Sequence, residues 1–157
     1  MTNDLTKLEE RVQATPTGAE LAYLLNSLAL SYSIEQRHEE AVQTFERYIT
    51  LRNSHLPDQT PKQKSFDSFQ HGEYLQAVGR LDEAIQQYLN AVEVDTDSAG
   101  SYHRVKRIIE RQGKDFQEFI DSMPTGKSCN VFKTIHWLTT DADLRSVREL
   151  LDSLKRE

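Results

Sequence analysis

Two stretches of the chain share one spacing of small, aromatic and aliphatic residues, and this internal repeat constrains the fold most. They cover residues 19–51 and 65–94, and their anchor alanines lie 43 positions apart. The aligned pairs are Ala29 with Gly72, Ala41 with Ala84, Phe45 with Tyr88, Ile49 with Val92 and Leu51 with Val94. Self-similarity at such a period is typical of proteins in which one small unit stacks on the next.

Each unit is predicted to form two helices joined by a tight turn, because apolar residues recur at three- and four-residue steps. Gly79 separates the two halves of the second unit, where a left-handed residue can close the turn. Thr60-Pro61 is expected to start that unit's first helix. Thr17 with Glu20 suggests a capping box for the first unit. The small residues would let paired helices approach closely while aromatic side chains fill the groove between them.

This pattern resembles the tetratricopeptide repeat. The first unit matches its consensus at Leu25, Leu28, Ala29, Tyr32, Ala41 and Phe45, and the second at Gly79, Ala84, Tyr88 and Ala91. The departures are Tyr48, where a small residue is usual, Ser68 and His71, where large apolar residues are usual, and Asn53 and Thr96 in place of the closing proline. The resemblance implies an all-α, right-handed α-α superhelix, a solenoid of antiparallel helix hairpins, and it implies protein or peptide binding rather than catalysis.

The 157 residues are expected to form one domain. Its parts are repeat 1 at about 19–52, an insertion at 52–65, repeat 2 at about 61–97, a degenerate repeat 3 at about 98–123 and capping helices at 128–157. The spacing of 43 residues between the two units exceeds the 34 of the family repeat by nine, and these extra residues fall in the insertion. A long loop with an extended helix start after Pro61 is predicted. A solvated rim segment is the favoured interpretation, and a functional loop is the alternative.

The flanking segments are expected to cap the two ends of the stack, because solenoid ends need such cover. Leu5, Leu8 and Val12 predict a short first helix. Residues 128–140 could be helix or strand, and the neighbouring helices favour helix. Residues 142–155 carry a helical stripe with Thr140 as its expected cap; the stripe consists of Leu144, Val147, Leu150, Leu151 and Leu154.

Composition narrows the function further. The net charge of −6 disfavours a nucleic-acid or anionic-membrane partner. No apolar run reaches the ~20 residues of a membrane span, and the N-terminal segment lacks a signal-peptide core. A single cysteine, Cys129, excludes an internal disulfide framework and makes a reducing cytoplasm the expected compartment. The sequence predicts no cofactor and no metal site.

Catalysis is not expected. The five histidines lack the spacing of metal ligands, and no glycine-rich phosphate loop occurs. Cys129 and His136 could share a helix face two turns apart, but a nucleophilic dyad also needs an orienting third group. Cys129 is interpreted instead as a small packed residue, and the chain as a non-enzyme.

The resemblance places the first helix of each unit on a concave surface. The predicted partner-binding residues there are Tyr23, Asn26, Phe66, Phe69, Gln70, Glu73, His103, Arg104, Arg107 and Arg111. Phe66 and Phe69 stand out because the repeat framework does not require aromatic residues at these positions. The alternative is that the insertion folds over them, or that Phe66 packs at a helix start.

The third unit is basic. Residues 98–114 carry a net charge of +4, which leaves −10 for the remainder of the chain. A solvated face explains this cluster, and recognition of an acidic peptide or a C-terminal carboxylate is the functional alternative. Some family members clamp acidic chaperone tails, but of the corresponding positions here only Arg104 agrees, so that clamp is not expected.

Together these features predict a non-catalytic adaptor or scaffold that holds a partner peptide or helix in its groove. The alternative is a structural subunit that forms a homo-oligomer through the same surface, or through the helix at 142–155. The sequence identifies neither the partner nor the pathway, the organism or the oligomeric state.

Overall fold

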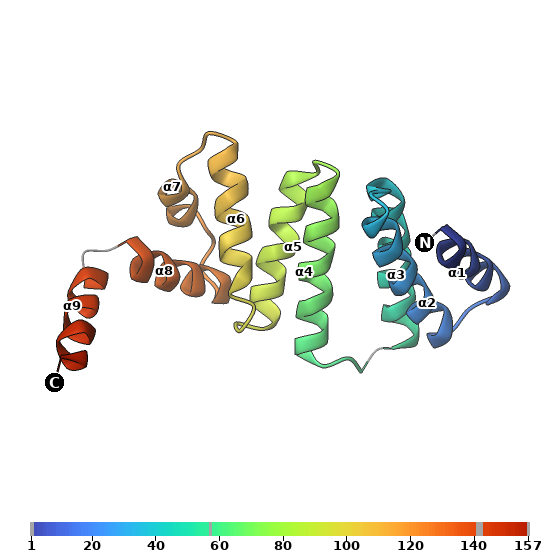
Figure 1. The fold of residues 1–157 in the computed structure, drawn as a ribbon, viewed down its shortest axis with the longest axis horizontal. Helices are drawn as coiled ribbons and strands as arrows, with labels where there is room; N and C mark the ends of the chain where they lie inside the picture. The colour runs from blue at the N-terminus through green and yellow to red at the C-terminus, as the bar shows by residue number, and fades with distance from the viewer. Residues whose placement is uncertain (1, 57, 141–142, 157) are drawn as a thin grey trace.

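The fold is a row of helices, seen in a computed structural model that describes residues 2–56, 58–140 and 143–156 (Figure 1). Within these ranges no strand is present, so the expected all-α, tetratricopeptide-like fold is confirmed. The helices are α1 (Thr2–Ala14), α2 (Ala19–Ile34), α3 (His38–His55), α4 (Pro61–Ala77), α5 (Leu81–Val94), α6 (Gly100–Arg111), α7 (Phe116–Asp121), α8 (Lys127–Thr140) and α9 (Asp143–Lys155). Among the described helices, none is both long and apolar enough to cross a bilayer.

Three hairpins, α2–α3, α4–α5 and α6–α7, turn in the same way. Each turn has one residue in the left-handed region, namely Gln36 at φ 60°, Gly79 at φ 80° and Gly113 at φ 73°. The residue that follows donates its backbone N–H to a carbonyl five positions earlier, as Arg80 does to Leu75 over 3.0 Å. This geometry ends a helix by satisfying its last carbonyl groups. Gly79 therefore closes the second hairpin, as the sequence predicts.

The segment between the first two hairpins is shorter than expected. Helix α3 continues to His55 and α4 begins at Pro61, so the connection is limited to residues 56–60. The prediction of a long loop is therefore wrong for residues 52–55, which extend α3, whereas the predicted helix start after Pro61 is confirmed. Helix α4 starts as predicted, since Gln63 N donates to Thr60 Oγ1 and Thr60 N donates to Gln63 Oε1, both over 3.2 Å.

The start of α2 differs from its prediction. Its N-cap is Gly18, at φ 103°, and no side chain caps the helix. The Thr17 hydroxyl instead hydrogen-bonds to His55 Nε2 over 3.4 Å, at the far end of α3. The predicted capping box of Thr17 with Glu20 is therefore wrong. Gly18 takes the N-cap position in a left-handed conformation, so Thr17 lies one residue before it.

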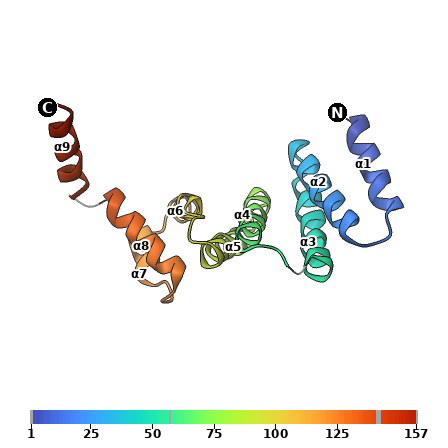
Figure 2. The same ribbon diagram turned by 90° about the horizontal axis from the view of Figure 1, so that it is seen from below.

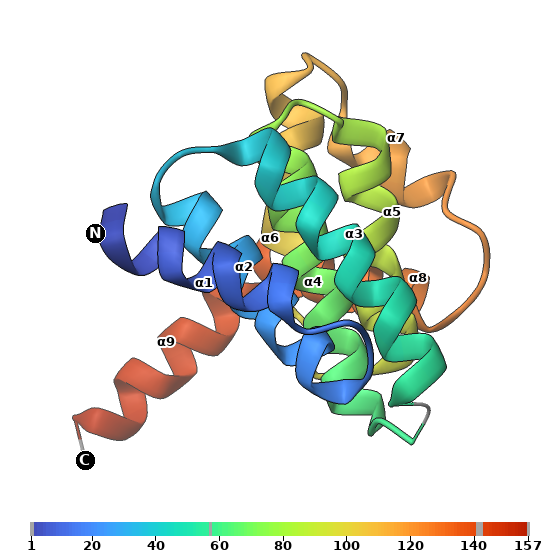
Figure 3. The same ribbon diagram turned by 90° about the vertical axis from the view of Figure 1, so that its right-hand side faces the viewer.

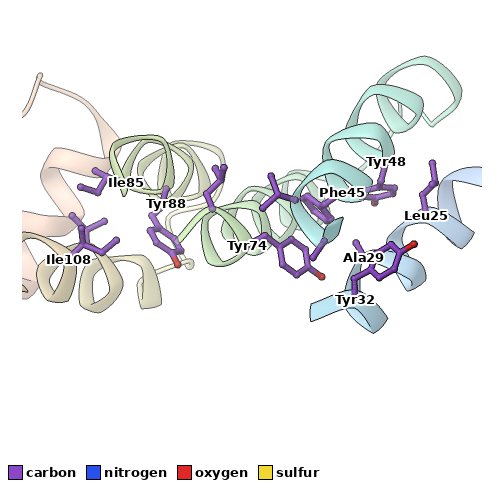
Figure 4. Close-up of a cluster of buried hydrophobic side chains, with 14 of the residues drawn as sticks. Leu25, Ala29, Tyr32, Phe45, Tyr48, Tyr74, Ile85, Tyr88 and Ile108 are labelled. Carbon is purple, nitrogen blue, oxygen red and sulfur yellow. The ribbon is translucent and has the colours of Figure 1, made fainter. Parts of the chain in front are cut away.

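The core depends on an aromatic side chain from the second helix of a hairpin resting on a small residue of the first. Tyr88 and Phe45 are fully buried, and a Cβ atom at Gly72 would lie 2.7 Å from Tyr88 Cε1. Phe45 also packs edge-on against Tyr74 of the next hairpin, with ring centroids 5.0 Å apart (Figure 4). Phe45 thus joins the first hairpin to the second.

His71 occupies a position where the family has a large apolar residue, and it packs in that role. Its ring lies 5.6 Å from the Phe45 ring, and Glu46 Oε1 lies 3.6 Å from Nε2. Burial lowers the pKa of His71 below its usual value, although the nearby Glu46 carboxylate opposes this shift. Neutral imidazole is therefore the form that fits between the first two hairpins.

Helix α1 covers one end of the row as expected, with Leu5 and Val12 buried. At the other end α8 is helical, and its start is fixed by Glu93 of α5. Oε1 of Glu93 accepts hydrogen bonds from Ser128 N and Ser128 Oγ over 2.8 and 2.6 Å. These two bonds lower the pKa of Glu93. Phe132 is then fully buried against the third hairpin.

Helix α9 does not cap the stack. It extends away from the other helices at the end of the row (Figures 1 and 2), and its C-terminal end projects below α1 in Figure 3. Leu150, Leu151 and Leu154 are exposed to 61, 51 and 59 %. The prediction that this helix covers the end of the stack is therefore wrong for these three leucines. The side chains of Leu144 and Val147, the other residues of the predicted stripe, lie outside the described part of the structure. Thr140 does not cap α9, because it ends α8 and donates its hydroxyl to the His136 carbonyl over 2.5 Å.

We expect Gly72→Ala to lower the free energy of unfolding by about 1–3 kcal/mol, since the added methyl group overpacks the contact with Tyr88. The control is Gly100→Ala, whose Cβ would meet only Phe69, at 3.9 Å. Urea unfolding followed by circular dichroism measures both variants. Equal stabilities for the two variants would contradict the close approach at Gly72.

A second prediction concerns pH. Because the folded pKa of His71 lies below the unfolded value, the unfolded state binds more protons, so stability falls as pH drops through about 6.5. We expect the urea midpoint to decrease between about pH 7.5 and about pH 5.5, and to decrease less in His71→Leu. The control, His103→Gln, removes an exposed imidazole and should keep the decrease of the unmodified chain. An undiminished decrease in His71→Leu would contradict this assignment.

Candidate functional site: the inner helical face

The first helices of the hairpins, α2, α4 and α6, lie toward the side to which both ends of the row bend (Figure 2). On α2, the outward stripe is apolar, with Tyr23, Leu30 and Ile34 exposed to 62, 51 and 60 %. Their spacing of seven and four residues places them along one side of the helix. Asn26 is half-buried beside them. We call the surface that α2, α4 and α6 form on this side of the row the inner face.

Helix α4 continues the inner face with a mixed character. Phe66 is exposed to 63 %, so the short segment before α4 does not cover it. Phe69 is different, because its ring packs against Tyr88 with centroids 5.3 Å apart and lies 5.6 Å from the Arg104 guanidinium. Phe69 therefore joins the second hairpin to the third. Gln70 and Glu73 are half-buried on the same helix.

Helix α6 supplies the cationic part of the inner face. Arg104 pairs with Glu73 of α4, with Nη2 and Oε2 3.3 Å apart, and is therefore already engaged. Arg107 and Arg111 are exposed and form no ion pair with any residue in the described ranges. His103 is exposed and meets the Tyr102 ring edge-on, with centroids 5.2 Å apart. The inner face thus changes from apolar on α2 to cationic on α6.

A buried ion pair that the sequence did not predict joins α4 to α3, next to Phe66. Asp67 Oδ2 accepts from Arg52 Nη1 over 2.6 Å and from the Tyr48 hydroxyl over 3.0 Å. Burial first, and then the charge of Asp67, raise the pKa of Tyr48 to about 12. This contact explains why Tyr48 stands where the family has a small residue. That departure from the family pattern was the only signal in the sequence that could have indicated the ion pair.

Cys129 and His136 gain no support as a catalytic pair. Cys129 is buried, and His136 Nδ1 lies 3.0 Å from the Tyr102 hydroxyl, to which it is hydrogen-bonded. The His136 ring also packs against Phe116, with centroids 5.6 Å apart. Across residues 2–56, 58–140 and 143–156, no group of three or more histidine, cysteine, aspartate or glutamate side chains is placed to hold a metal ion.

Comparison with protein families gives a match to the family described as Tetratricopeptide repeat over residues 22–55. The matched stretch covers nearly all of α2, its left-handed turn and α3 through its last residue. No curated protein matches the chain. The family match therefore coincides with the first of the three hairpins.

We expect Asp67→Asn to lower the free energy of unfolding by about 3–5 kcal/mol, because it leaves the Arg52 guanidinium buried without its counter-charge. The control is Glu83→Gln, which breaks an exposed pair with Arg80 and should cost less than about 1 kcal/mol. Urea unfolding curves measure both. Similar losses for the two variants would show that the buried pair does not hold α3 against α4.

Proposed function

We propose that this tetratricopeptide-repeat protein is a non-catalytic adaptor that binds a segment of a partner protein along the inner face. The observation that carries the proposal is the exposure of four large apolar side chains on the first two hairpins. They are Tyr23, Leu30, Ile34 and Phe66. Exposed apolar groups that gather on one surface mark protein-interaction sites more often than scattered ones do.

The proposed partner segment is apolar at one end and acidic at the other. Tyr23 and Phe66 would act as anchors, because aromatic rings bury a large area while few torsions become fixed. Arg107 and Arg111 would meet carboxylates, because a guanidinium offers two parallel donors to a carboxylate. The order of α2, α4 and α6 along the row then sets the direction in which the segment lies.

Arg104 has a different role in this proposal. Its pairing with Glu73 and its position over Phe69 hold the second and third hairpins together. A ligand carboxylate would have to displace Glu73 before it could bind Arg104. The proposed contact cations are therefore Arg107 and Arg111, whose side chains are free of such contacts among the described residues.

To test this function, peptides are selected against the full chain from a random peptide display library, and their affinities are measured by fluorescence polarisation. We expect selected peptides to combine aromatic or aliphatic residues with acidic ones. Phe66→Ala and the double change Arg107→Glu with Arg111→Glu should each weaken binding about tenfold or more, without lowering the melting temperature.

The matched control is Trp137→Ala, which removes an aromatic side chain exposed to 50 % on α8, away from the inner face. It should leave the affinity unchanged. If Trp137→Ala weakens peptide binding and Phe66→Ala does not, the binding site lies elsewhere and the proposal is contradicted.

A further inference from the structure

The third hairpin leaves a cleft beside the second. The cleft has a volume of about 820 Å3 and lies between the start of α5 and the α6–α7 turn. Its apolar lining consists of Ile85, Ile109 and Phe119. The acidic residues that line it are Asp82, Asp115 and Glu118, and their side chains are exposed; Lys114 is the cation among the lining residues.

The cleft exists because α7 is too short to cover the start of α5. Helix α7 has 6 residues, whereas α5, the second helix of the preceding hairpin, has 14. Helix α7 packs against α6 and α8. The start of α8 covers the end of α5 through Glu93 and Ser128, so the start of α5 stays open. The side-chain oxygen of Gln112, another lining residue, is buried and accepts no hydrogen bond from the described residues.

Helix α9 has the complementary character. Its exposed leucines, Leu150, Leu151 and Leu154, form an apolar stripe that no described side chain covers. Arg148 and Lys155 are exposed and lie seven residues apart, which places them along one edge of that stripe with Leu151 between them. The exposed Asp152 lies between the two cations on the side away from the leucines, so this edge carries a net charge of +1. A helix of 13 residues is marginally stable alone in water, so contact with another surface would stabilise it.

We propose that α9 of one copy docks into the α5–α7 cleft of a second copy. The leucines would pack against the half-buried Phe119, with Ile85 and Ile109 forming the buried floor of the cleft, and the cationic edge of α9 would face Asp82 and Glu118. This site is separate from the inner face, so the proposal does not depend on the proposed function.

Symmetry follows from this contact. Each copy carries both elements, so each copy can give its α9 and accept that of its partner. Reciprocal docking closes the contact into a two-fold dimer rather than an open filament.

The test starts with the oligomeric state of the full chain, measured by size-exclusion chromatography with light scattering. We expect a dimer for the unmodified protein. Leu151→Asp should give a monomer, and so should the cleft variant Asp82→Lys with Glu118→Lys. Circular dichroism and the melting temperature establish that each variant is folded. A monomeric unmodified chain, including one in which α9 covers its own cleft, would overturn the proposal.

Two matched controls separate this contact from other modes of association. Leu30→Asp changes a leucine that is exposed to 51 %, as Leu151 is, but lies on the inner face. Glu39→Lys changes the residue that corresponds to Asp82 in the first repeat. Both control proteins should stay dimeric. A cleft variant that stays dimeric would indicate pairing of α9 with α9 and would overturn the proposal.

The decisive experiment exchanges the charges between the two surfaces. Arg148→Glu with Lys155→Glu makes the edge of α9 acidic, and this variant should be monomeric alone, like the cleft variant. When the two monomeric variants are mixed, the acidic α9 meets the basic cleft and the basic α9 meets the acidic cleft. We expect heterodimers, because both contacts of a reciprocal dimer are restored. The absence of heterodimers would overturn the proposal.

Discussion

The close approach of two helices within each hairpin is the constraint on which the rest of the structure depends. Tyr88 lies so near Gly72 that a side chain at that position would collide with its ring. Phe45 aligns with Tyr88 in the first repeat, is fully buried, and packs against Tyr74 in the second hairpin. Because each aromatic ring fixes the distance between its two helices, the first helices fall on one side of the row.

That arrangement explains the inner face and how far the sequence could predict it. The side of α2 that packs against α3 is buried, so the register of the repeat leaves Tyr23 exposed on the opposite side. Phe66 follows by the same register on α4. Phe69 and Arg104 could not be assigned in this way, because their contact joins two hairpins and depends on the offset between them. Sequence periodicity describes one helix at a time and does not contain that offset.

Polar groups that act between hairpins were the least predictable. Arg52, Tyr48 and Asp67 meet because α3 is long enough to bring its last turns beside the start of α4. The sequence favours a loop over this stretch, since it is polar and contains two prolines. The helix nevertheless extends, because buried partners compensate for its polar residues. The outcome for α9 is opposite: its pattern is strongly amphipathic, but its leucines find no cover in the described chain.

The sequence by itself determined the all-α class, the hairpin repeat, the turn at Gly79 and the capped start of α4. These features depend on residues close together in the chain, where the spacing of small and apolar side chains fixes local geometry. Only the tertiary structure decided which side chains stay exposed, where Asp67 finds its partners, and that a short α7 leaves a cleft beside α5. These outcomes depend on how one hairpin sits against the next, and that packing involves residues far apart in the sequence.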